Sequence, residues 1–478
     1  MANDIIIDSI NLGGLSDGKY QGAKNSIAAM RNLDVHTENG IIRLSRGFTN
    51  KATVVSHSKD VDAIVPDSSG YTWFFDTDGN VVMRNSSGTY SDATAVNPTG
   101  GNGVSDAKQY EDYVYYAMER RIGRFQVQSD GAGYATKADD WGTPTGTGVS
   151  DRCMAEVNEI LYISAGRYID QIESGVLTTN VLSFPTGWNI TSMGVFGTDL
   201  LIGMNKTGNV DQARIVRWNT WSADNSFTSD DLIPESKISA FLPLDNYVIV
   251  AAGKRGNLYF YNGSVLAPFK KVPNDGTFNA QGEVKLNAAT NFMGQMHFGI
   301  SKVSGNNIPQ GIYSYGSYAA GYPLVLTMPH RISTEDLTGY TGDTNVRITA
   351  MAIRDEKLLV AWMDDSSGSN VRGIDESTTT VHSSGYFDTR VINVARTESK
   401  TFSVEVAYRT IPENTDIQIW LSKDGGAFAQ VDATTDALRK LKCADQDSGE
   451  CTTIQVRVLL TGSSSSTPEI EQLKISFN

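Results

Sequence analysis

Residues 154–172 read MAEVNEILYISAGRYIDQI and contain three short runs of apolar and β-branched residues, at 154–157, 160–163 and 168–172. Asn158 and Glu159 separate the first two runs, and a segment that contains Gly166 separates the second and third. Short turns of this composition between apolar runs are typical of antiparallel strands. The segment therefore predicts three neighbouring strands of one small antiparallel sheet.

The same unit recurs along most of the chain. Its central apolar runs lie at residues 73–75, 113–116, 160–163, 200–202, 247–250, 297–300 and 358–361, so they begin 40, 47, 40, 47, 50 and 61 residues apart. Four-stranded antiparallel units at about this period are typical of β-propeller blades, although only three strands of each unit can be recognised from the residues. Blades that stack around an axis bury both faces of each sheet, which explains why the central runs are continuously apolar.

The sequence therefore predicts an all-β fold with a propeller of six to eight blades, and the number of recurring units favours seven. A propeller ring is often closed by a strand from the N-terminal side, which residues 41–44 or 53–55 could supply. One helix is predicted before the repeats, at residues 25–33, with Asn25 or Ser26 as its cap.

The pattern changes after residue 383. The runs at 401–406, 416–421, 453–458 and 470–475 alternate apolar and polar residues, as half-exposed strands do. Alternating strands of this kind favour a small β-sandwich behind the propeller. We expect three parts: an N-terminal arm at 1–50 that could hold the closing strand, the propeller at 51–383 and the sandwich at 384–478.

The charge of the chain disfavours nucleic acid as a partner. Its 40 Lys and Arg residues against 54 Asp and Glu residues give a net charge of −14. Because Lys and Arg supply most of the affinity for phosphates, we expect no sequence-specific binding to nucleic acid. No run of about eighteen apolar residues predicts a membrane span, and the first residues lack the pattern of a signal peptide. We therefore expect a protein that folds in a cytoplasm.

The residues that could perform chemistry do not form a recognisable motif. The chain has five histidines, His36, His57, His297, His330 and His382, and none has the spacing of a metal motif. Residues 76–80 resemble the start of a calcium loop, but Val81 and Ser87 stand where the loop needs Gly and Glu, so a turn is expected. The pairs Asp139-Asp140 and Asp364-Asp365 were the best candidates for a glycan hydrolase, but adjacent carboxylates in polar loops are usually only solvated. We predict no enzymatic activity, no catalytic residue, no cofactor and no metal.

Two sets of residues are candidates for interactions. Tryptophans in expected loops could stack on a glycan or pack between blades or at a subunit interface, and the second interpretation is favoured; they are Trp141, Trp188, Trp218 and Trp221. Cys443 and Cys451 flank a short polar loop at 444–450, so a hairpin could bring them together. They are interpreted either as two thiols or as a disulfide that forms in an oxidising exterior.

Both ends of the chain resemble proteins of the tails of tailed bacteriophages. At the N-terminus the resemblance is carried by NLGGL at 11–15, AMRNLD at 29–34, NGIIR at 39–43 and Arg46-Gly47. At the C-terminus it is carried by GYFD at 385–388, LSKDGG at 421–426 and TPEIEQL at 467–473. The chain departs from the commoner opening at 18–22, where GKYQG stands in place of a segment that contains Pro.

The resemblance is to tail hub, nozzle and minor tail proteins, which carry a propeller and a trailing β-sandwich. It implies a structural component of the virion tail, assembled in the host cytoplasm as a ring of identical subunits that contact portal, adaptor or tail-tube proteins. The alternative is a propeller at the tail tip that binds a host-surface receptor or glycan; a glycan hydrolase is the less favoured third hypothesis.

Overall fold

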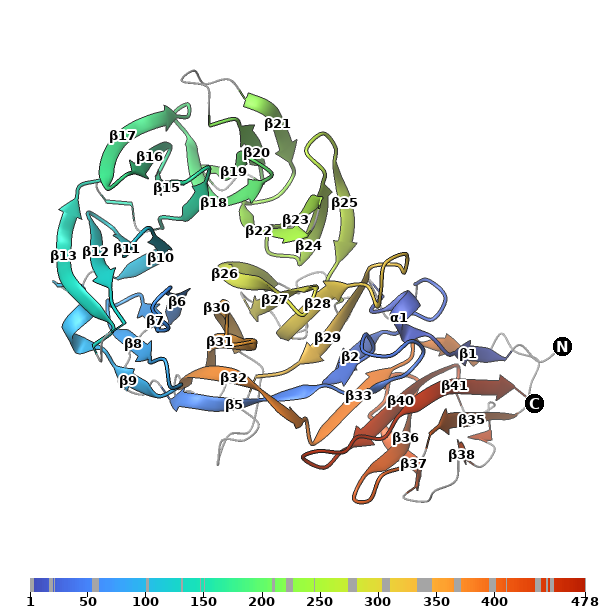
Figure 1. Cartoon of the computed structure of the whole chain (residues 1–478). Coiled ribbons are helices and arrows are strands. Elements are labelled where there is room, and N and C mark those ends of the chain that lie inside the picture. The colour runs from blue at the N-terminus through green and yellow to red at the C-terminus, as the bar shows by residue number, and fades with distance from the viewer. Residues whose placement is uncertain are drawn as a thin grey trace.

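The chain is described from a computed structural model. The structure describes all residues except 1–3, 17–19, 21, 54–59, 100–102, 130–131, 147, 150, 209–210, 221–226, 245, 274–281, 303–309, 333–345, 365–370, 395–400, 410, 435–439, 444–445, 448–450 and 478. Figure 1 shows a ring of small sheets around a central axis and a layered β unit beside the ring, with both chain ends at the far side of that unit.

Seven antiparallel blades of four strands surround the axis, and one parallel residue pair, Asn287 with Ala350, joins blades six and seven into an eight-stranded sheet. From the axis outwards, blade one is β6 (Val61–Pro66), β7 (Thr72–Asp76), β8 (Val81–Arg84) and β9 (Tyr90–Asp92), and blade two is β10 (Val104–Tyr110), β11 (Tyr113–Met118), β12 (Ile122–Val127) and β13 (Tyr134–Gly142). Blade three is β14 (Met154–Val157), β15 (Ile160–Ala165), β16 (Tyr168–Glu173) and β17 (Val176–Ser183), and blade four is β18 (Trp188–Phe196), β19 (Asp199–Lys206), β20 (Ala213–Trp218) and β21 (Phe227–Ile233).

Blade five is β22 (Ile238–Leu244), β23 (Tyr247–Ala252), β24 (Asn257–Tyr261) and β25 (Leu266–Lys271), and blade six is β26 (Gly282–Phe292), β27 (Gln295–Lys302), β28 (Gly311–Gly316) and β29 (Val325–His330). Blade seven is β30 (Val346–Arg354), β31 (Lys357–Asp364), β32 (Val371–Val381) and β5 (Arg46–Thr53). The prediction of an all-β propeller is confirmed, with seven blades. Each apolar run recognised in the sequence lies in the second strand of a blade, where Trp73, Leu161 and Val250 are fully buried between neighbouring sheets.

The N-terminal arm closes the ring. β5 pairs antiparallel with β32, with Thr53 opposite Gly373 and Phe48 opposite Ser377. Neither segment considered from the sequence is the main part of this strand, because residues 43–44 form β4 (Arg43–Leu44) on β3 (Leu33–Asp34), and residues 54–55 lie outside the described residues. The closing strand reads RGFTNKAT and has few apolar residues, so its sequence pattern does not reveal it.

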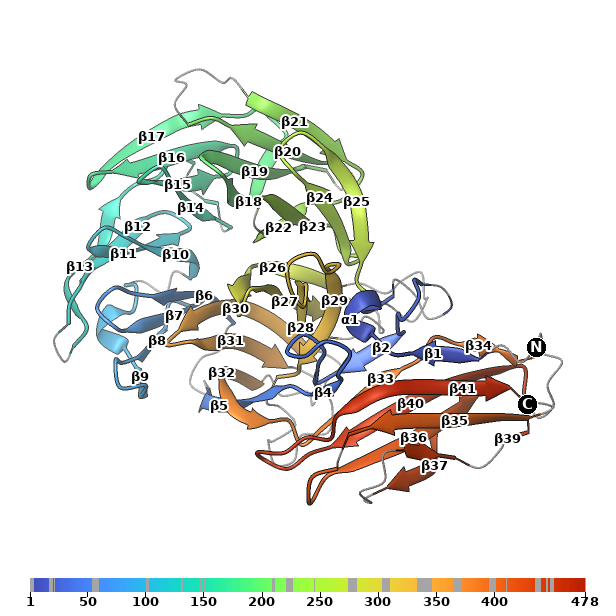
Figure 2. The ribbon, with the colours of Figure 1, turned by 45° about the vertical axis from the view of Figure 1, so that its right-hand side comes forward.

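The sandwich has two sheets, and the N-terminal arm contributes a strand to each. One sheet holds β1 (Ile5–Ile7), β41 (Ile470–Phe477), β35 (Thr401–Tyr408), β38 (Lys440–Lys442) and β39 (Gln446–Asp447). The other holds β2 (Ala29–Arg31), β33 (Ser384–Asp388), β40 (Thr453–Thr461), β36 (Asp416–Lys423), β37 (Ala429–Thr434) and β34 (Ile392–Asn393). In Figure 2 the blue arm runs along the sandwich before it reaches the propeller.

Residues 25–33 do not form the predicted helix. Asn25 and Asn32 have φ angles of 62° and 57°, which an α-helix does not contain, and β2 pairs between them with β33. Pairing with the distant strand overrides the local helical tendency, because it buries Met30 in the core. The α-helix of this region is the single turn α1 (Ile10–Gly13), and no described helix is long and apolar enough to cross a membrane.

The propeller and the sandwich share a hydrophobic core. One cluster of buried side chains extends from Ile249 and Phe298 in blades five and six, through Leu33 of the arm, to Val404 and Val458 in the two sheets of the sandwich. Burial of apolar surface stabilises by about 25 cal/mol per Å². A continuous core therefore opposes separation of the two parts in water.

Candidate functional site: the joint between propeller and sandwich

The joint is made where the N-terminal arm passes between blade six and the sandwich. The Leu15 N–H donates to the Leu326 carbonyl oxygen on β29 at 2.7 Å, which attaches the arm to the outer strand of the blade. The Asn32 side chain donates to the Ser384 carbonyl oxygen at 3.1 Å, at the start of the sandwich. The Ser45 hydroxyl donates to the Pro329 carbonyl oxygen. The arm is thus bonded to both parts along its length.

Two glycines of the tail-like segment allow this close approach. A Cβ on Gly13 would lie 2.3 Å from the carbonyl carbon of Asn25, and a Cβ on Gly14 would lie 2.7 Å from the Leu326 carbonyl oxygen. Gly14 also has a φ angle of 59°, in the left-handed region that favours glycine. The packing of the arm therefore requires glycine at 13–14, since any side chain there would push the arm away from its neighbours.

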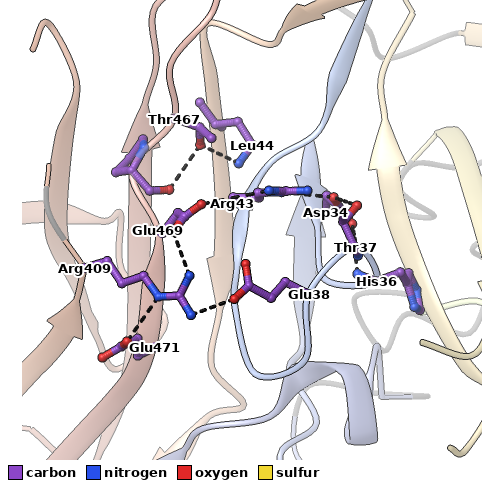
Figure 3. A network of polar contacts seen from close by, with 11 residues as sticks. Asp34, His36, Thr37, Glu38, Arg43, Leu44, Arg409, Thr467, Glu469 and Glu471 are labelled. Carbon is purple, nitrogen blue, oxygen red and sulfur yellow. Dashed lines mark hydrogen bonds and ion pairs between the residues drawn. The ribbon is translucent and has the colours of Figure 1, made fainter. Parts of the chain in front are cut away.

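Figure 3 shows a polar network on the solvent side of the joint. The Arg409 guanidinium of the sandwich contacts Glu38 of the arm at 2.7 Å, Glu469 at 3.3 Å and Glu471 at 3.4 Å. Arg43 of the arm contacts Asp34 at 3.3 Å and reaches Glu469 at 3.9 Å. The hydrogen bond with Glu38 is the main reason that the pKa of Arg409 is raised. The network links arm and sandwich through charge, and its exposure to solvent keeps each pair weak.

Asp34 fixes the local shape of the arm within this network. Burial would raise the pKa of its carboxyl group, but hydrogen bonds from Thr37 and from the His36 N–H, together with the charge of Arg43, hold that pKa below its usual value. An ionised carboxylate that accepts these bonds closes the turn at 34–37. The turn carries Glu38 to its position opposite Arg409.

Three buried histidines lie close together behind the joint. The ring centroids of His297 and His330 are 5.9 Å apart, and those of His330 and His382 are 6.2 Å apart. His330 Nδ1 bonds to the Arg46 carbonyl oxygen at 2.9 Å, and the His382 N–H donates to the Ser45 carbonyl oxygen at 3.0 Å. Burial lowers the pKa of His297 and of His330 to about 3 and that of His382 to about 4. All three rings are therefore neutral at neutral pH.

Sequence reasoning could not find the joint. Its histidines, glycines and charged residues come from segments far apart in the chain, and none has a motif spacing. The one signal was the resemblance of residues 11–15 and 29–47 to tail proteins, because these residues build most of the arm side of the joint.

The candidate tryptophans are not brought together. Trp141 lies in β13, against the Tyr115 ring with a centroid distance of 5.2 Å and beneath Arg124. Trp188 begins β18, near Arg214. Trp218 is 4% exposed and packs on Tyr162 of blade three, so it lies between blades rather than on a surface. Trp221 lies outside the described residues.

The remaining candidates from the sequence have structural surroundings. Cys443 and Cys451 are both buried in the core of the sandwich, and Cys443 Sγ accepts a hydrogen bond from the Val404 N–H at 3.3 Å. Asp139 accepts a bond from the Tyr116 hydroxyl at 2.6 Å, and Asp140 lies 3.7 Å from Arg121.

Asp364 is fully buried at the end of β31, and Asp365 lies outside the described residues. Asp76 accepts bonds from the N–H groups of Asp78 and Asn80, which makes the turn that the sequence predicts. Within the described part of the chain, no group of three His, Cys, Asp or Glu residues is placed to hold a metal ion.

The central channel is crossed by an irregular strand. In β26 the pairing with β27 shifts between Val284 and Ala289, so extra residues project toward the axis. Asn287 donates to the Asp62 carbonyl oxygen at 2.8 Å and to the Asp106 carboxylate at 2.9 Å, which ties blade six to blades one and two. Cavities of about 540 Å³ and about 870 Å³ lie along the channel, and Leu286 and Asn287 line both.

Comparison with known proteins shows no family for this chain. No family model and no curated protein matches the chain. The extracellular domain of a protein described as a hybrid two-component system from B. thetaiotaomicron matches 76% of this chain with 14% identity and a TM-score of 0.46, and this chain spans 44% of its length. The WD40 β-propeller domain of Doa1 and U3-55K each match 69% of the chain with 10% identity, with TM-scores of 0.42 and 0.45, over 97% and 99% of their lengths. These matches concern the propeller fold alone.

Proposed function

We propose that this chain is a structural subunit of a tailed-phage virion, placed in the tail as a hub, nozzle or minor tail protein and acting through protein–protein contacts. One observation carries the proposal: the residues at 11–15 and 29–47, which resemble the opening of tail proteins, are those that join the propeller to the sandwich. A subunit of a tail must keep two binding surfaces in a fixed relative orientation, and a joint with a continuous core meets that need.

The outer rim of the propeller supports assembly with neighbouring subunits. Val176 on β17, Leu232 on β21 and Val265 beside β25 are 62%, 59% and 53% exposed. These strands belong to three consecutive blades, and Figure 1 shows them on the rim away from the sandwich. Apolar side chains on exposed edge strands are a typical place for contact with another chain. On this proposal the partners are further copies in a ring and portal, adaptor or tail-tube proteins.

The proposal is tested by mass and by location. The purified chain should form a multimer in light scattering, and labelled antibodies should find it in the tail of purified particles by electron microscopy. The double variant Val176→Asp with Leu232→Asp should shift the mass toward that of one chain. The control pair Met293→Asp with Leu324→Asp, at two other exposed apolar residues, should leave the mass unchanged. A chain that is monomeric at all concentrations and absent from particles contradicts the proposal.

The alternative of a glycan-binding propeller has less support. Stacking on a sugar needs exposed aromatic faces that lie near one another. Among the described candidates, Trp218 is buried, and Trp141 and Trp188 lie in different blades against arginines of their own sheets. Glycan binding that is lost on substitution of Trp141 and Trp188 would favour this alternative over assembly.

A further inference from the structure

The turns between the first and second strands of the blades surround one mouth of the channel. We call this surface the turn face, and it comprises residues 67–71, 111–112, 158–159, 197–198, 246, 293–294 and 355–356. Neighbouring turns are bonded to one another: the Tyr110 hydroxyl donates to the Glu159 carbonyl oxygen at 2.6 Å, and Asn158 donates to the Thr198 carbonyl oxygen at 2.9 Å. These bonds link the turns of blades two, three and four.

The turn face is acidic. Six exposed carboxylates belong to it or border it: Glu111, Asp112, Glu156, Glu159, Asp355 and Glu356. Asp355 forms ion pairs with Arg84 and Arg354, and no described Lys or Arg forms an ion pair with any of the other five. Lys108 is the cation nearest to the cavity at this mouth. The ring therefore presents an excess of negative charge around the mouth of the channel.

Turn geometry does not explain these glutamates. Glu111, Glu159 and Glu356 have φ angles of 51°, 61° and 58°. Two-residue turns with positive φ favour Gly, Asn and Asp, and a longer side chain is disfavoured there. Glutamate therefore raises the backbone energy of the turns in three blades. Its presence there is explained if the turns need the negative charge of its side chain.

A basin with apolar and polar walls lies inside the acidic ring. Its cavity has a volume of about 870 Å³. Partly exposed apolar side chains come from Ile64, Val195, Phe196 and Phe241, and polar ones from Lys108, Gln109, Glu156 and Asn246. Leu286 and Asn287 line it too, and Asn287 is held by its bonds to blades one and two, so the basin has a floor. Val195 is 36% exposed in this wall.

We propose that this basin binds a segment of a partner protein that carries a bulky apolar side chain flanked by Lys or Arg. The apolar side chain enters the basin and displaces water from its walls, while the flanking cations face the carboxylates of the ring. Charge complementarity selects this occupant, because the same face of a second copy would carry the same negative charge and be repelled. The basin and the acidic ring belong to the propeller itself, so this binding does not depend on whether the chain is part of a virion.

The first test uses labelled synthetic peptides and fluorescence anisotropy with the full chain. The probe has a central Leu-Phe pair between two Lys-Arg pairs. One control peptide has Ser-Ser at its centre, and the other has Glu in place of each Lys and Arg. The probe should bind at least about tenfold more tightly than either control, and its affinity should fall about tenfold between about 50 mM and about 500 mM salt.

The second test maps binding to the turn face. The double variant Glu111→Lys with Glu356→Lys should weaken the probe at least about fivefold, since it reverses two charges of the ring. The control double variant Asp211→Lys with Glu413→Lys changes the net charge equally at exposed carboxylates outside the turn face and should bind as the parent does. Val195→Asn should also weaken binding, whereas Leu324→Asn, at an exposed apolar residue outside both the turn face and the rim, should not. Lys108→Glu should tighten binding and provides a gain of function.

Several results would overturn the proposal. Equal binding of the Ser-Ser peptide, or full competition by spermidine, would mean that charge alone attracts ligands and that the basin is unused. Equal losses in the two double variants would mean a response to net charge rather than to the turn face. Self-association that the probe reverses would make a second copy the occupant. Absence of probe binding by a folded chain would also contradict the proposal.

Discussion

The ring and the joint are both completed by the N-terminal arm, but they are held in different ways. The ring closes through a ladder that runs from Arg46 opposite Val381 to Thr53 opposite Gly373, and each blade repeats the same pattern of buried strands. The joint has no ladder of that length, since β1 and β2 have three residues each. Besides the hydrophobic core that the two parts share, it depends on two close-packed glycines, three neutral histidines and an exposed ion network. We therefore expect a substitution in the repeated blades to reduce stability less than a substitution at one of the single contacts of the joint.

The largest difference should appear when the pH falls. In the unfolded chain histidine has a pKa of about 6.5. The folded pKa values are about 3 for His330 and about 4 for His382. The unfolded state therefore takes up more protons as the pH falls below about 6.5, and stability is lost until the folded pKa values are reached. Between pH 7 and pH 5 the loss should be about 2 kcal/mol for each histidine, or about 4 kcal/mol for the pair.

Denaturant unfolding at several pH values would check this expectation. The variant His330→Gln with His382→Gln should lose about 4 kcal/mol less than the parent over that range. Asp62 in the channel acts in the opposite direction, because burial raises its pKa to about 7 and favours the folded state as the pH falls. Asp62→Asn should therefore make the acid loss steeper. Equal pH dependence of the histidine variant and the parent would mean that these histidines do not cause the loss of stability in acid.

An added methyl group should lower the free energy of unfolding by about 3 kcal/mol more in the joint than in the ring. Gly13→Ala places a Cβ 2.3 Å from the Asn25 carbonyl carbon, so the backbone of the arm must move. Gly47→Ala in the closing strand meets nothing closer than 3.6 Å and should change the free energy of unfolding by less than about 0.5 kcal/mol. Urea unfolding of both variants measures the contrast. If the two alanines are equally tolerated, the close approach of the arm is not essential.

Loss of the contacts that β26 makes across the channel should cause an intermediate loss of stability. Asn287→Ala removes two hydrogen bonds and leaves the buried Asp106 carboxylate with one fewer donor. The expected destabilisation is about 2 kcal/mol, with faster amide exchange in β6 and β10. Lys285→Ala, next to it in β26, changes a partly exposed side chain and serves as the control. Unchanged exchange in Asn287→Ala would mean that the crossing does not tie the blades together.

The exposed ion network should have the smallest effect. Arg409→Gln should lower the temperature of unfolding only slightly at low salt, and this loss should shrink at about 0.5 M salt, because exposed pairs are screened. Lys440→Gln removes a single exposed pair with Glu405 and should be nearly neutral. Thermal unfolding at two salt concentrations compares the two variants. A loss at Arg409 that does not depend on salt would mean that its packing, rather than its charge, stabilises the joint.

The sequence predicted the part of the fold that repeats. The runs from 73–75 to 358–361 mark the second strand of every blade, because a strand buried on both faces needs apolar residues at every position. The closing strand was expected from the N-terminal arm, but its position was not predicted, because Phe48 is almost its only large apolar residue. β1 and β2 escaped it because strands of three residues are stabilised by distant partners such as Ile475 and Phe387, and no local pattern encodes such pairing.

The candidate sites were less predictable for the same physical reason. Glu38 and Arg409 are far apart in the chain, and so are His36 and Thr327, so their proximity follows from the finished fold. The residues at 11–15 stood out in the sequence only through their resemblance to tail proteins. The structure shows that two of them, Gly13 and Gly14, pack closely against neighbouring backbone. The turn face was hidden because its glutamates stand where turns usually have Gly or Asn.

Because β5 pairs with β32, the ring cannot close until β32 has been synthesised. The ribosome must add 320 residues after Thr53 before Gly373, its partner, exists. At about 5 to 20 residues per second this takes roughly 15 to 65 seconds. During that time the arm has neither its blade nor its sandwich strands, since β1 and β2 also wait for β41 and β33. Any chain interrupted before β32 leaves the ring open, because β5 then has no partner strand in blade seven.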